Sequence, residues 1–239
     1  WDRSSEDRYG DPGSPVMRRD ASGQWVLQVT SKGQLLLLGD GASPEGDRPF
    51  YDRLDVATGK SERIWRSEGA TYASIDEVLD QDGGEVLIQR ESSATPPQLY
   101  AYSFAAKQER QITRFAHPVP ELANVKKQLI KWKRKDGVEL SGMLYLPAGF
   151  RPKTDAPLPV VVWVYPQEFK SASAASQVSD SPHRFSYPSW GGPMFALTQG
   201  YAVVDDPAFV IVGEGKTEPN DTYIEQLSSD AESLIDHVV

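Results

Sequence analysis

The chain has 239 residues, of which 39% are hydrophobic, and carries a formal net charge of −9 at pH 7. This composition is typical of a globular protein with one large or two modest domains, and the negative charge argues against nucleic acids and anionic membranes as partners. Cysteine is absent and only three histidines occur, which argues against disulfides, a cysteine nucleophile and a metal site. We therefore expect neither a metal nor a cofactor.

Two further features of the sequence concern its ends and its apolar runs. It opens on Trp1 without an initiator methionine or an apolar leader, which we interpret as a segment of a longer protein. No apolar run approaches the roughly 18 residues that a membrane-spanning helix needs.

Residues 1–120 are predicted to form short β-strands joined by turns. Polar turn sequences such as SPEGD at 43–47, ATGK at 57–60 and DQDGG at 80–84 separate runs rich in β-branched and aromatic residues, as expected for an all-β region. The predicted strands are 25–30, 34–38, 50–55, 63–66, 85–89, 98–104 and 109–113. Short strands at nearly even spacing indicate a sandwich or a propeller.

An internal repeat favours the propeller. The stretches PFYDRLDVATGKSERIW and PQLYAYSFAAKQERQIT begin at Pro49 and Pro97, 48 residues apart. Each has an alternating strand, a short polar turn and a second strand, with Ile64 and Ile112 at the matching place. A period of roughly 40–50 residues is typical of propeller blades. We therefore predict part of a β-propeller in this region.

From residue 121 the pattern becomes that of an α/β fold. Residues 128–147 alternate around a turn at Asp136-Gly137, which predicts a hairpin whose second strand ends at a proline. The apolar run 160–164 predicts a strand buried on both faces, residues 191–200 a short helix that ends at Gly200, and 201–206 a second apolar strand. A helix with a capping-box spacing at Thr222 and Glu225 is predicted over 220–239, with an apolar face formed by Ile224, Leu227, Ala231, Leu234, Ile235 and Val238.

The basic run KKQLIKWKRK at 126–135 is open to two interpretations. Six basic residues beside aromatic and aliphatic ones could form a nucleic-acid patch. In a strand, however, Ile130, Trp132 and Arg134 share one face, and the lysines at 131, 133 and 135 share the other. We favour the strand with one solvated face and expect no nucleic-acid partner.

Five stretches that span nearly the whole chain contain uncommon dipeptides: EDRYGDPGSPVMRR at 6–19, ASPEGDRPFYD at 42–52, RKDGVELSGMLYLPAGF at 134–150, VYPQEFKSASAASQV at 164–178 and GEGKTEPNDTYIEQL at 213–227. They resemble the prolyl oligopeptidase family of serine peptidases, and more narrowly its glutamyl-endopeptidase branch. The resemblance implies that residues 1–120 are the C-terminal blades of a β-propeller. It also implies that residues 121–239 are the N-terminal part of an α/β-hydrolase domain, truncated before the nucleophile elbow.

The same resemblance implies Ser-His-Asp acyl-enzyme chemistry on peptide bonds, and its narrower form, to the glutamyl-endopeptidase branch, implies cleavage after Glu. The sequence contains no G-x-S-x-G motif, so all three triad residues are expected beyond Val239 and the chain alone is expected to be inactive. His183 and His237 are interpreted as structural. The one catalytic group expected here is Tyr165, because the loop after this strand helps to build the oxyanion hole in the family. Alternatively, Tyr165 only caps the end of a strand.

Glutamyl specificity would need a cation near the substrate carboxylate, preferably a bidentate arginine. The candidates are Arg18 and Arg19, which lie in a stretch that carries the resemblance, and Arg184. Each can equally be a solvated surface arginine.

Several functions remain open at this point. The alternatives are another enzyme of the same family, such as an acylaminoacyl or dipeptidyl peptidase or an esterase, a non-catalytic propeller binding module, and a segment without a function of its own. The leading hypothesis expects a peptide substrate, no membrane partner and an undetermined oligomeric state. The resemblance allows a bacterial periplasm or cytoplasm, or a plastid stroma. Expressed alone, the chain is expected to be poorly soluble or oligomeric, because an apolar sheet edge would lack its partner.

Overall fold

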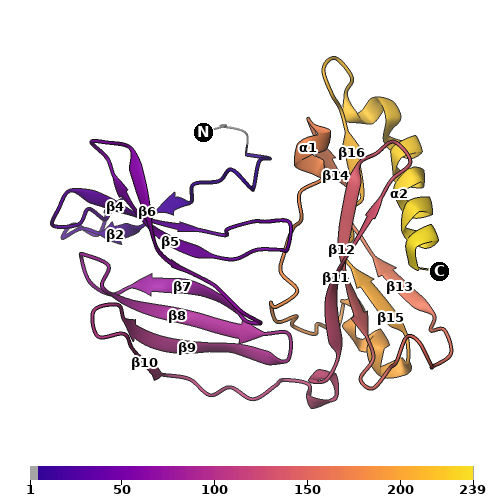
Figure 1. Cartoon of the computed structure of the whole chain (residues 1–239), viewed down its shortest axis with the longest axis horizontal. Helices are drawn as coiled ribbons and strands as arrows, with labels where there is room; N and C mark the ends of the chain where they lie inside the picture. Colours follow the sequence, from indigo (N-terminus) through magenta and orange to yellow (C-terminus); the bar gives the residue numbers. More distant parts are fainter. Residues whose placement is uncertain (1–4, 239) are drawn as a thin grey trace.

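Figure 1 shows the chain as a computed structural model, which describes residues 5–238. Two halves lie side by side. The first half of the chain forms antiparallel β-sheets, and from about residue 121 the chain forms a mixed sheet flanked by helices. No helix among residues 5–238 is long and apolar enough to cross a membrane.

The first half contains two antiparallel sheets of four strands each. Their orders are β1-β4-β5-β6 and β10-β9-β8-β7, so that most neighbours in the sheet are also neighbours in the chain. This up-and-down order is that of propeller blades. The strands are β1 (Ser14–Pro15), β4 (Gln34–Gly39), β5 (Phe50–Asp55), β6 (Lys60–Arg66), β7 (Tyr72–Val78), β8 (Glu85–Ser92), β9 (Thr95–Ser103) and β10 (Gln108–Gln111).

The two blade-like sheets share one hydrophobic core. It contains Leu36 and Tyr51 of the first sheet and residues of the second, including Val86 and Ile88, all between 0% and 1% exposed. Full burial of each such side chain contributes about 1.5–3 kcal/mol. The Tyr51 hydroxyl donates to the carbonyl oxygen of Gly83 at 3.3 Å. A side chain at Gly83 would collide with that hydroxyl, and its φ of +71° favours glycine.

The repeat predicted from the sequence coincides with equivalent places in the two sheets. Its first copy forms β5 and β6, and its second copy forms β9 and β10, in each case the third and fourth strands of a sheet. Strand β7 was not predicted. The register shifts between Ile75 and Glu77, and this irregularity breaks the alternation that identifies a strand in a sequence.

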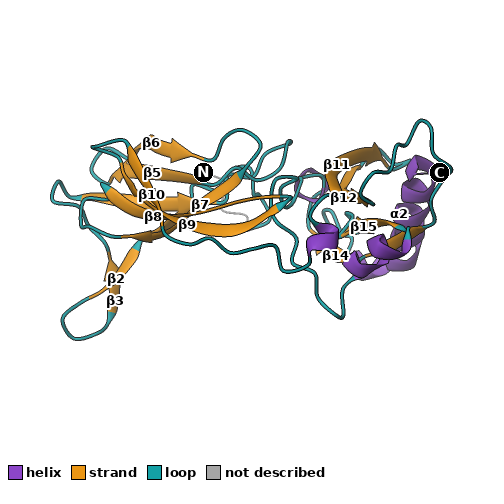
Figure 2. Ribbon diagram, turned by 90° about the horizontal axis from the view of Figure 1, so that it is seen from below, coloured by secondary structure: helices purple, strands orange, loops and turns teal. Residues whose placement is uncertain are grey.

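A two-stranded ribbon leaves the first sheet between β1 and β4. It consists of β2 (Met17–Arg19) and β3 (Trp25–Leu27), and Figure 2 shows that it projects away from the rest of the molecule. Its side chains are largely solvent-exposed, with Met17 at 42% and Trp25 at 60%.

The second half is built on a mixed sheet with the order β11-β12-β15-β13. Strands β11 (Lys126–Lys133) and β12 (Glu139–Leu146) form the predicted hairpin, β15 (Ala202–Asp205) is antiparallel to β12, and β13 (Val160–Trp163) is parallel to β15. The predicted alternation of the basic run is confirmed: Trp132 and Arg134 are buried, while the three lysines between and beside them are exposed.

Shorter elements complete this half. Strands β14 (Gln167–Phe169) and β16 (Val210–Val212) form a parallel pair. The helices are η1 (Pro120–Leu122), α1 (Ala172–Ala175), η2 (Pro193–Gln199), η3 (Pro219–Thr222) and α2 (Tyr223–Val238). Helix α2 packs on one face of the sheet through Leu234, beside Trp132 and Val204. The 3-10 helix η2 packs on the other face through Met194 and Leu197 and ends, as predicted, at Gly200 with φ +81°.

Three predictions for this half were wrong in detail. Strand β13 is not buried on both faces. It lies at the sheet edge, and within residues 5–238 it pairs with β15 alone, so Val160 and Val162 are 37% and 39% exposed. The cap of the terminal helix is not Thr222 with Glu225. The helix follows η3, where the Glu218 N–H donates to Asp221 Oδ2 at 3.0 Å. Ile224 and Ile235 of the predicted apolar face are exposed at 67% and 55%.

Candidate active site

The candidate site lies where the two parallel strands β13 and β15 end. The last residues of the two strands, Trp163 and Asp205, are paired, and the chain segments that follow them form the parallel pair β14 and β16. The Asp206 N–H donates to the carbonyl oxygen of Trp163 at 2.9 Å, and the Gln167 N–H donates to that of Phe209 at 2.9 Å. The carboxyl ends of parallel strands are the usual place for ligands in α/β sheets.

A cavity of about 230 Å³ opens at these strand ends. Four segments line it: residues 5–8, the stretch from Tyr165 to Phe169, the region of α1, and the stretch from Asp206 to Val210. The wall therefore combines the two strand ends with the first residues of the chain.

Tyr165 is an exposed functional group on this cavity. Its side chain is 65% exposed, and its ring meets the Trp163 ring edge-on at 6.4 Å between centroids. Among residues 5–238, none forms a hydrogen bond with its hydroxyl. The next two backbone positions provide no free hydrogen-bond donor. Pro166 has no N–H, and the Gln167 N–H donates to the carbonyl oxygen of Phe209. The phenol is thus an unengaged neutral donor at the strand end.

Asp206 faces the same cavity from the end of β15. Its φ is +47°, in the left-handed region that non-glycine residues rarely adopt. The surrounding walls desolvate the carboxylate and raise its pKa, and the negative charge of Asp180 raises the pKa further. In the part of the chain that the structure describes, no side chain or backbone group bonds to this carboxylate.

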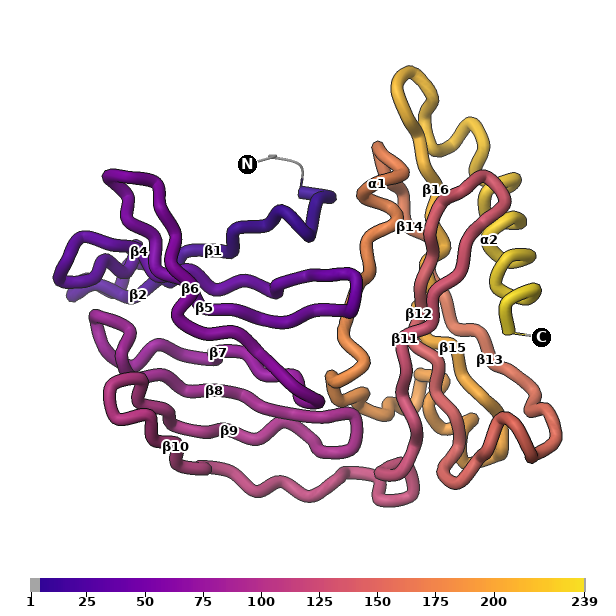
Figure 3. Tube along the Cα trace, viewed as in Figure 1, coloured from indigo at the N-terminus to yellow at the C-terminus, as the bar shows by residue number. Residues whose placement is uncertain are grey.

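Residues 5–9, here called the N-terminal strap, close one side of the cavity and tie the two halves together (Figure 3). Arg8 donates to the carbonyl oxygen of Val178 and to Asp47 Oδ2, both at 2.9 Å. The Tyr9 hydroxyl accepts from the Val178 N–H at 2.8 Å, and Gln177 donates to Asp7 Oδ1 at 2.7 Å. The strap thus fixes the cavity wall to the first blade-like sheet.

The junction between the halves is mainly polar. The Asp47 N–H donates to the carbonyl oxygen of Asp180 at 2.9 Å, and Lys127 donates to Asp180 Oδ2 at 3.2 Å. The Phe185 N–H donates to Glu91 of the second blade-like sheet at 3.2 Å. Burial raises the pKa of Asp47 to about 6, although the Arg8 guanidinium opposes the shift. Burial lowers the pKa of Lys127.

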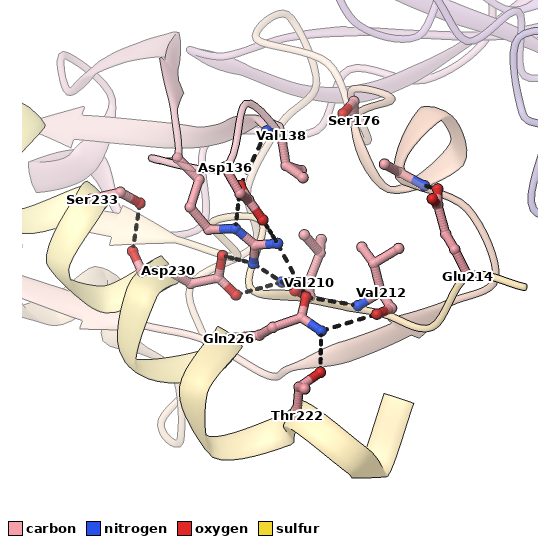
Figure 4. Close-up of polar contacts among 12 residues, drawn as sticks. Asp136, Val138, Ser176, Val210, Val212, Glu214, Thr222, Gln226, Asp230 and Ser233 are labelled. Atoms are coloured by element: carbon pink, nitrogen blue, oxygen red, sulfur yellow. Dashed lines mark hydrogen bonds and ion pairs between the residues drawn. The ribbon is translucent and has the colours of Figure 1, made fainter. Parts of the chain in front are cut away.

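A buried polar network holds the far wall of the cavity in place (Figure 4). Arg134 donates to Asp230 Oδ1 at 2.7 Å and to the carbonyl oxygen of Val210 at 3.0 Å. Asp230 Oδ2 in turn accepts from the Val210 N–H at 2.9 Å. Gln226 brackets Val212, accepting from its N–H at 3.0 Å and donating to its carbonyl oxygen at 2.9 Å. Since Val210 lines the cavity, this network sets the position of that wall.

Of the side chains predicted from the sequence, only Tyr165 lines the cavity. Arg18 and Arg19 lie on the projecting ribbon, where Arg19 stacks on Trp25 with its guanidinium carbon 4.7 Å from the ring centroid. Arg184 lies at the junction over the Tyr72 ring, 5.3 Å from its centroid, and is 3.7 Å from Asp180 Oδ1. The structure therefore does not bring the three arginines together with Tyr165.

Sequence reasoning missed Arg8 and Asp206 as cavity residues. Arg8 gives no local signal, because it reaches the cavity only when the chain folds back across more than 160 residues. Asp206 gives one: the apolar run AVV ends in two adjacent acids, at the kind of strand end where functional residues gather. Within residues 5–238 no group of three or more His, Asp or Glu side chains is placed to hold a metal ion.

Two curated proteins match the chain over its whole length. It is 44% identical to the probable chloroplastic glutamyl endopeptidase of Oryza sativa subsp. japonica and 40% identical to that of Arabidopsis thaliana. The matches cover 27% and 26% of those proteins, so the chain spans about a quarter of the length of these relatives. No family model matches the chain.

Solved structures show a related fold. Dipeptidyl peptidase 4 of Porphyromonas gingivalis matches 86% of the chain and 28% of its own, with a TM-score of 0.55 and 18% identity. Oligopeptidase B of Trypanosoma brucei, in a closed form with covalently bound antipain, matches 93% of the chain and 29% of its own, with a TM-score of 0.54 and 14% identity. The chain is thus similar in sequence to two probable glutamyl endopeptidases and similar in fold to peptidases of the prolyl oligopeptidase family.

Proposed function

We propose that the protein to which this chain belongs is a serine peptidase that cleaves peptide bonds after glutamate. In this proposal residues 1–120 are blades of a β-propeller and residues 121–239 begin the α/β-hydrolase domain. The triad serine, aspartate and histidine then lie in the three quarters of the relatives' length that the chain does not span. The names of the two relatives support the specificity and a plastid location.

The observation that carries the proposal is the state of Tyr165. Its hydroxyl lies at the carboxyl end of β13, on a cavity, without a partner among the described residues, while the adjacent backbone donors are missing or engaged. Hydrolysis of a peptide builds negative charge on the carbonyl oxygen, and a preorganised donor at about 2.7–3.1 Å stabilises that charge. In the proposed mechanism Tyr165 donates to the oxyanion, and the surrounding network keeps the cavity walls fixed.

The exposed edge of β13 fits the same proposal. Val160 and Val162 are apolar and more than one third exposed. Such an edge is a template for another strand. In the full-length protein we propose that the strand carrying the serine pairs here, which would cover both valines and bring the nucleophile next to Tyr165.

Of the three arginines considered for glutamate recognition, we propose Arg184. It lies at the junction of the two halves, and its side chain remains 53% exposed. Among the described residues, the only carboxylate within 4 Å of its guanidinium is that of Asp180, at 3.7 Å. This spacing leaves the guanidinium able to bind a substrate carboxylate.

The test uses the full-length protein and two fluorogenic peptides that differ only in Glu or Gln before the scissile bond. We expect hydrolysis of the Glu peptide, a strong preference for Glu over Gln, and labelling of one serine by a fluorophosphonate. Labelling with hydrolysis but no Glu preference would support another peptidase of the family. If the protein is not labelled and hydrolyses neither peptide, the enzyme proposal is refuted and a binding module is favoured.

A further inference from the structure

We propose that Asp206 binds a protonated amine of the substrate, either a free amino terminus or a lysine side chain, next to the bond that is cleaved. This inference rests on the proposed peptidase function and adds a substrate feature to it. Asp206 would be a specificity-determining residue that lines the same cavity as Tyr165.

The position of Asp206 supports this role. It follows β15 as Tyr165 follows β13, and the two strands are hydrogen-bonded neighbours. The Asp206 N–H donates to the carbonyl oxygen of Trp163, two residues before Tyr165. Both side chains line the same cavity of about 230 Å³. A substrate whose carbonyl oxygen meets the Tyr165 hydroxyl therefore passes close to the Asp206 carboxylate.

The backbone holds this carboxylate in a strained conformation. Asp206 has φ +47°. The chain on either side cannot relax easily, because Pro207 is almost completely buried and the Ala208 N–H donates to the carbonyl oxygen of Ser141 at 2.7 Å. Strain of this kind persists only where the surrounding structure imposes it. The backbone therefore fixes the direction of the Cα–Cβ bond of Asp206, whose side chain lines the cavity.

The charges around Asp206 leave it without compensation. Arg8 is the only cation that lines the cavity among the described residues, and it is paired with Asp47 at 2.9 Å. The nearby Lys127 is bonded to Asp180. Glu6 and Glu168 add negative charge to the cavity wall. The Asp206 side chain is solvent-exposed and has no bonded partner among the described residues. A cationic group of the substrate can therefore reach it and form a charge-assisted hydrogen bond.

Three peptides test the inference on the full-length enzyme. All have Glu before the scissile bond. The first is acetylated with norleucine at the preceding position, the second is acetylated with lysine there, and the third has norleucine and a free amino terminus. We expect kcat/KM to be about tenfold or more higher for at least one amine-bearing peptide than for the neutral one, the effect of one charged hydrogen bond. The peptide that gains identifies the source of the amine.

Two variants show whether Asp206 is responsible. Asp206→Asn keeps the shape and tolerates the left-handed backbone, and we expect it to remove most of the amine preference while the neutral peptide is still cleaved. It should also remove the rise in kcat/KM with pH that ionisation of Asp206 causes for the amine peptide. Glu168→Gln removes one charge from the same cavity and should leave the preference within about threefold of the wild type, by the weakness of exposed charge effects.

The outcomes separate the two proposals. Equal cleavage of all three peptides by the wild type, an unchanged preference in Asp206→Asn, or equal losses in both variants would overturn the role of Asp206 while the peptidase function stands. If none of the peptides is cleaved, the peptidase proposal and this inference fail together.

Discussion

The two halves of the molecule reach their folds by different means. In the blade-like half each strand pairs mostly with the next one in the chain, and two sheets bury one shared core. In the second half β15 is inserted between β12 and β13, and buried ionic groups join segments up to 96 residues apart. The first half is therefore stabilised mainly by local pairing and one apolar core, and the second half adds long-range polar contacts to its two apolar cores.

This difference explains where the chemistry lies. Local hairpins satisfy their own backbone groups and leave few free donors. Parallel strands end together and expose side chains at a common edge. Tyr165 and Asp206 lie at such an edge, and no residue of the blade-like sheets has a comparable position at the cavity. The blade-like half contributes to the site through Asp47, which anchors the N-terminal strap.

The largest expected effect is that of Asp230→Ala. Asp230 is 0% exposed and is bonded to Arg134 and to the Val210 N–H. Its removal leaves the buried guanidinium with Asp136 as its remaining carboxylate partner and the Val210 N–H without its acceptor. Breaking a buried ion pair typically costs about 3–5 kcal/mol, and the bonds to Asp136 should keep the loss at the lower end of that range. Hydrogen exchange in the full-length protein should show faster exchange at Val210 and along α2, with β8 and β9 unchanged.

Asp236→Ala is the matched control for that variant. Asp236 lies on the same helix but is exposed, so its replacement should change exchange by less than about 0.5 kcal/mol. If Asp230→Ala accelerated exchange in β8 and β9 as strongly as in α2, the two halves would unfold as one unit and the comparison between them would be wrong.

The second prediction concerns Tyr165→Phe. The change removes one hydroxyl from an exposed side chain, so the fold should be unaffected, while loss of one oxyanion donor lowers kcat by about 100- to 1000-fold. Steady-state kinetics of the full-length enzyme with the Glu peptide would measure this. Tyr187→Phe is a suitable control, because Tyr187 is similarly exposed at 64% and does not line the cavity. Equal activities of the two variants would remove Tyr165 from the mechanism.

The contrast between the halves also explains which features could be predicted from the sequence, because contacts between neighbouring residues leave a local pattern and long-range contacts do not. Alternation and turn residues located β4, β5 and β8 because antiparallel hairpins depend on neighbouring residues. Tyr165 was instead predicted from the family resemblance, and the pattern contributed only the apolar run that ends there. Reasoning from the pattern could not place Arg8 at the cavity, since that contact spans 170 residues. It also misjudged β13, because an apolar run alone does not show whether both strand edges are paired.

A smaller effect is expected from pH at the junction. The pKa of Asp47 is raised from 3.8 to about 6, so between these values the folded protein binds more protons than the unfolded chain. Raising the pH through this window therefore lowers the free energy of unfolding, and the loss persists above pH 6. Asp47→Asn should weaken this dependence. Thermal melts of both proteins from pH 4 to pH 7 would measure the difference, and parallel curves would mean that Asp47 titrates normally.

The smallest expected effects are changes in KM that distinguish Arg184 from Arg18 and Arg19 as the residue that recognises glutamate. Arg184→Ala should raise KM for the Glu peptide by about tenfold, the effect of one charge-assisted hydrogen bond, and leave the Gln peptide unchanged. Arg18→Ala and Arg19→Ala should stay within about twofold for both peptides, because exposed charges on a projecting ribbon contribute little. The ribbon serves as an internal control, since it belongs to the blade-like half and is remote from the cavity lining. A selective loss of Glu cleavage in Arg18→Ala or Arg19→Ala, but not in Arg184→Ala, would place glutamate recognition on the ribbon and show that the blade-like half contributes chemistry as well as support.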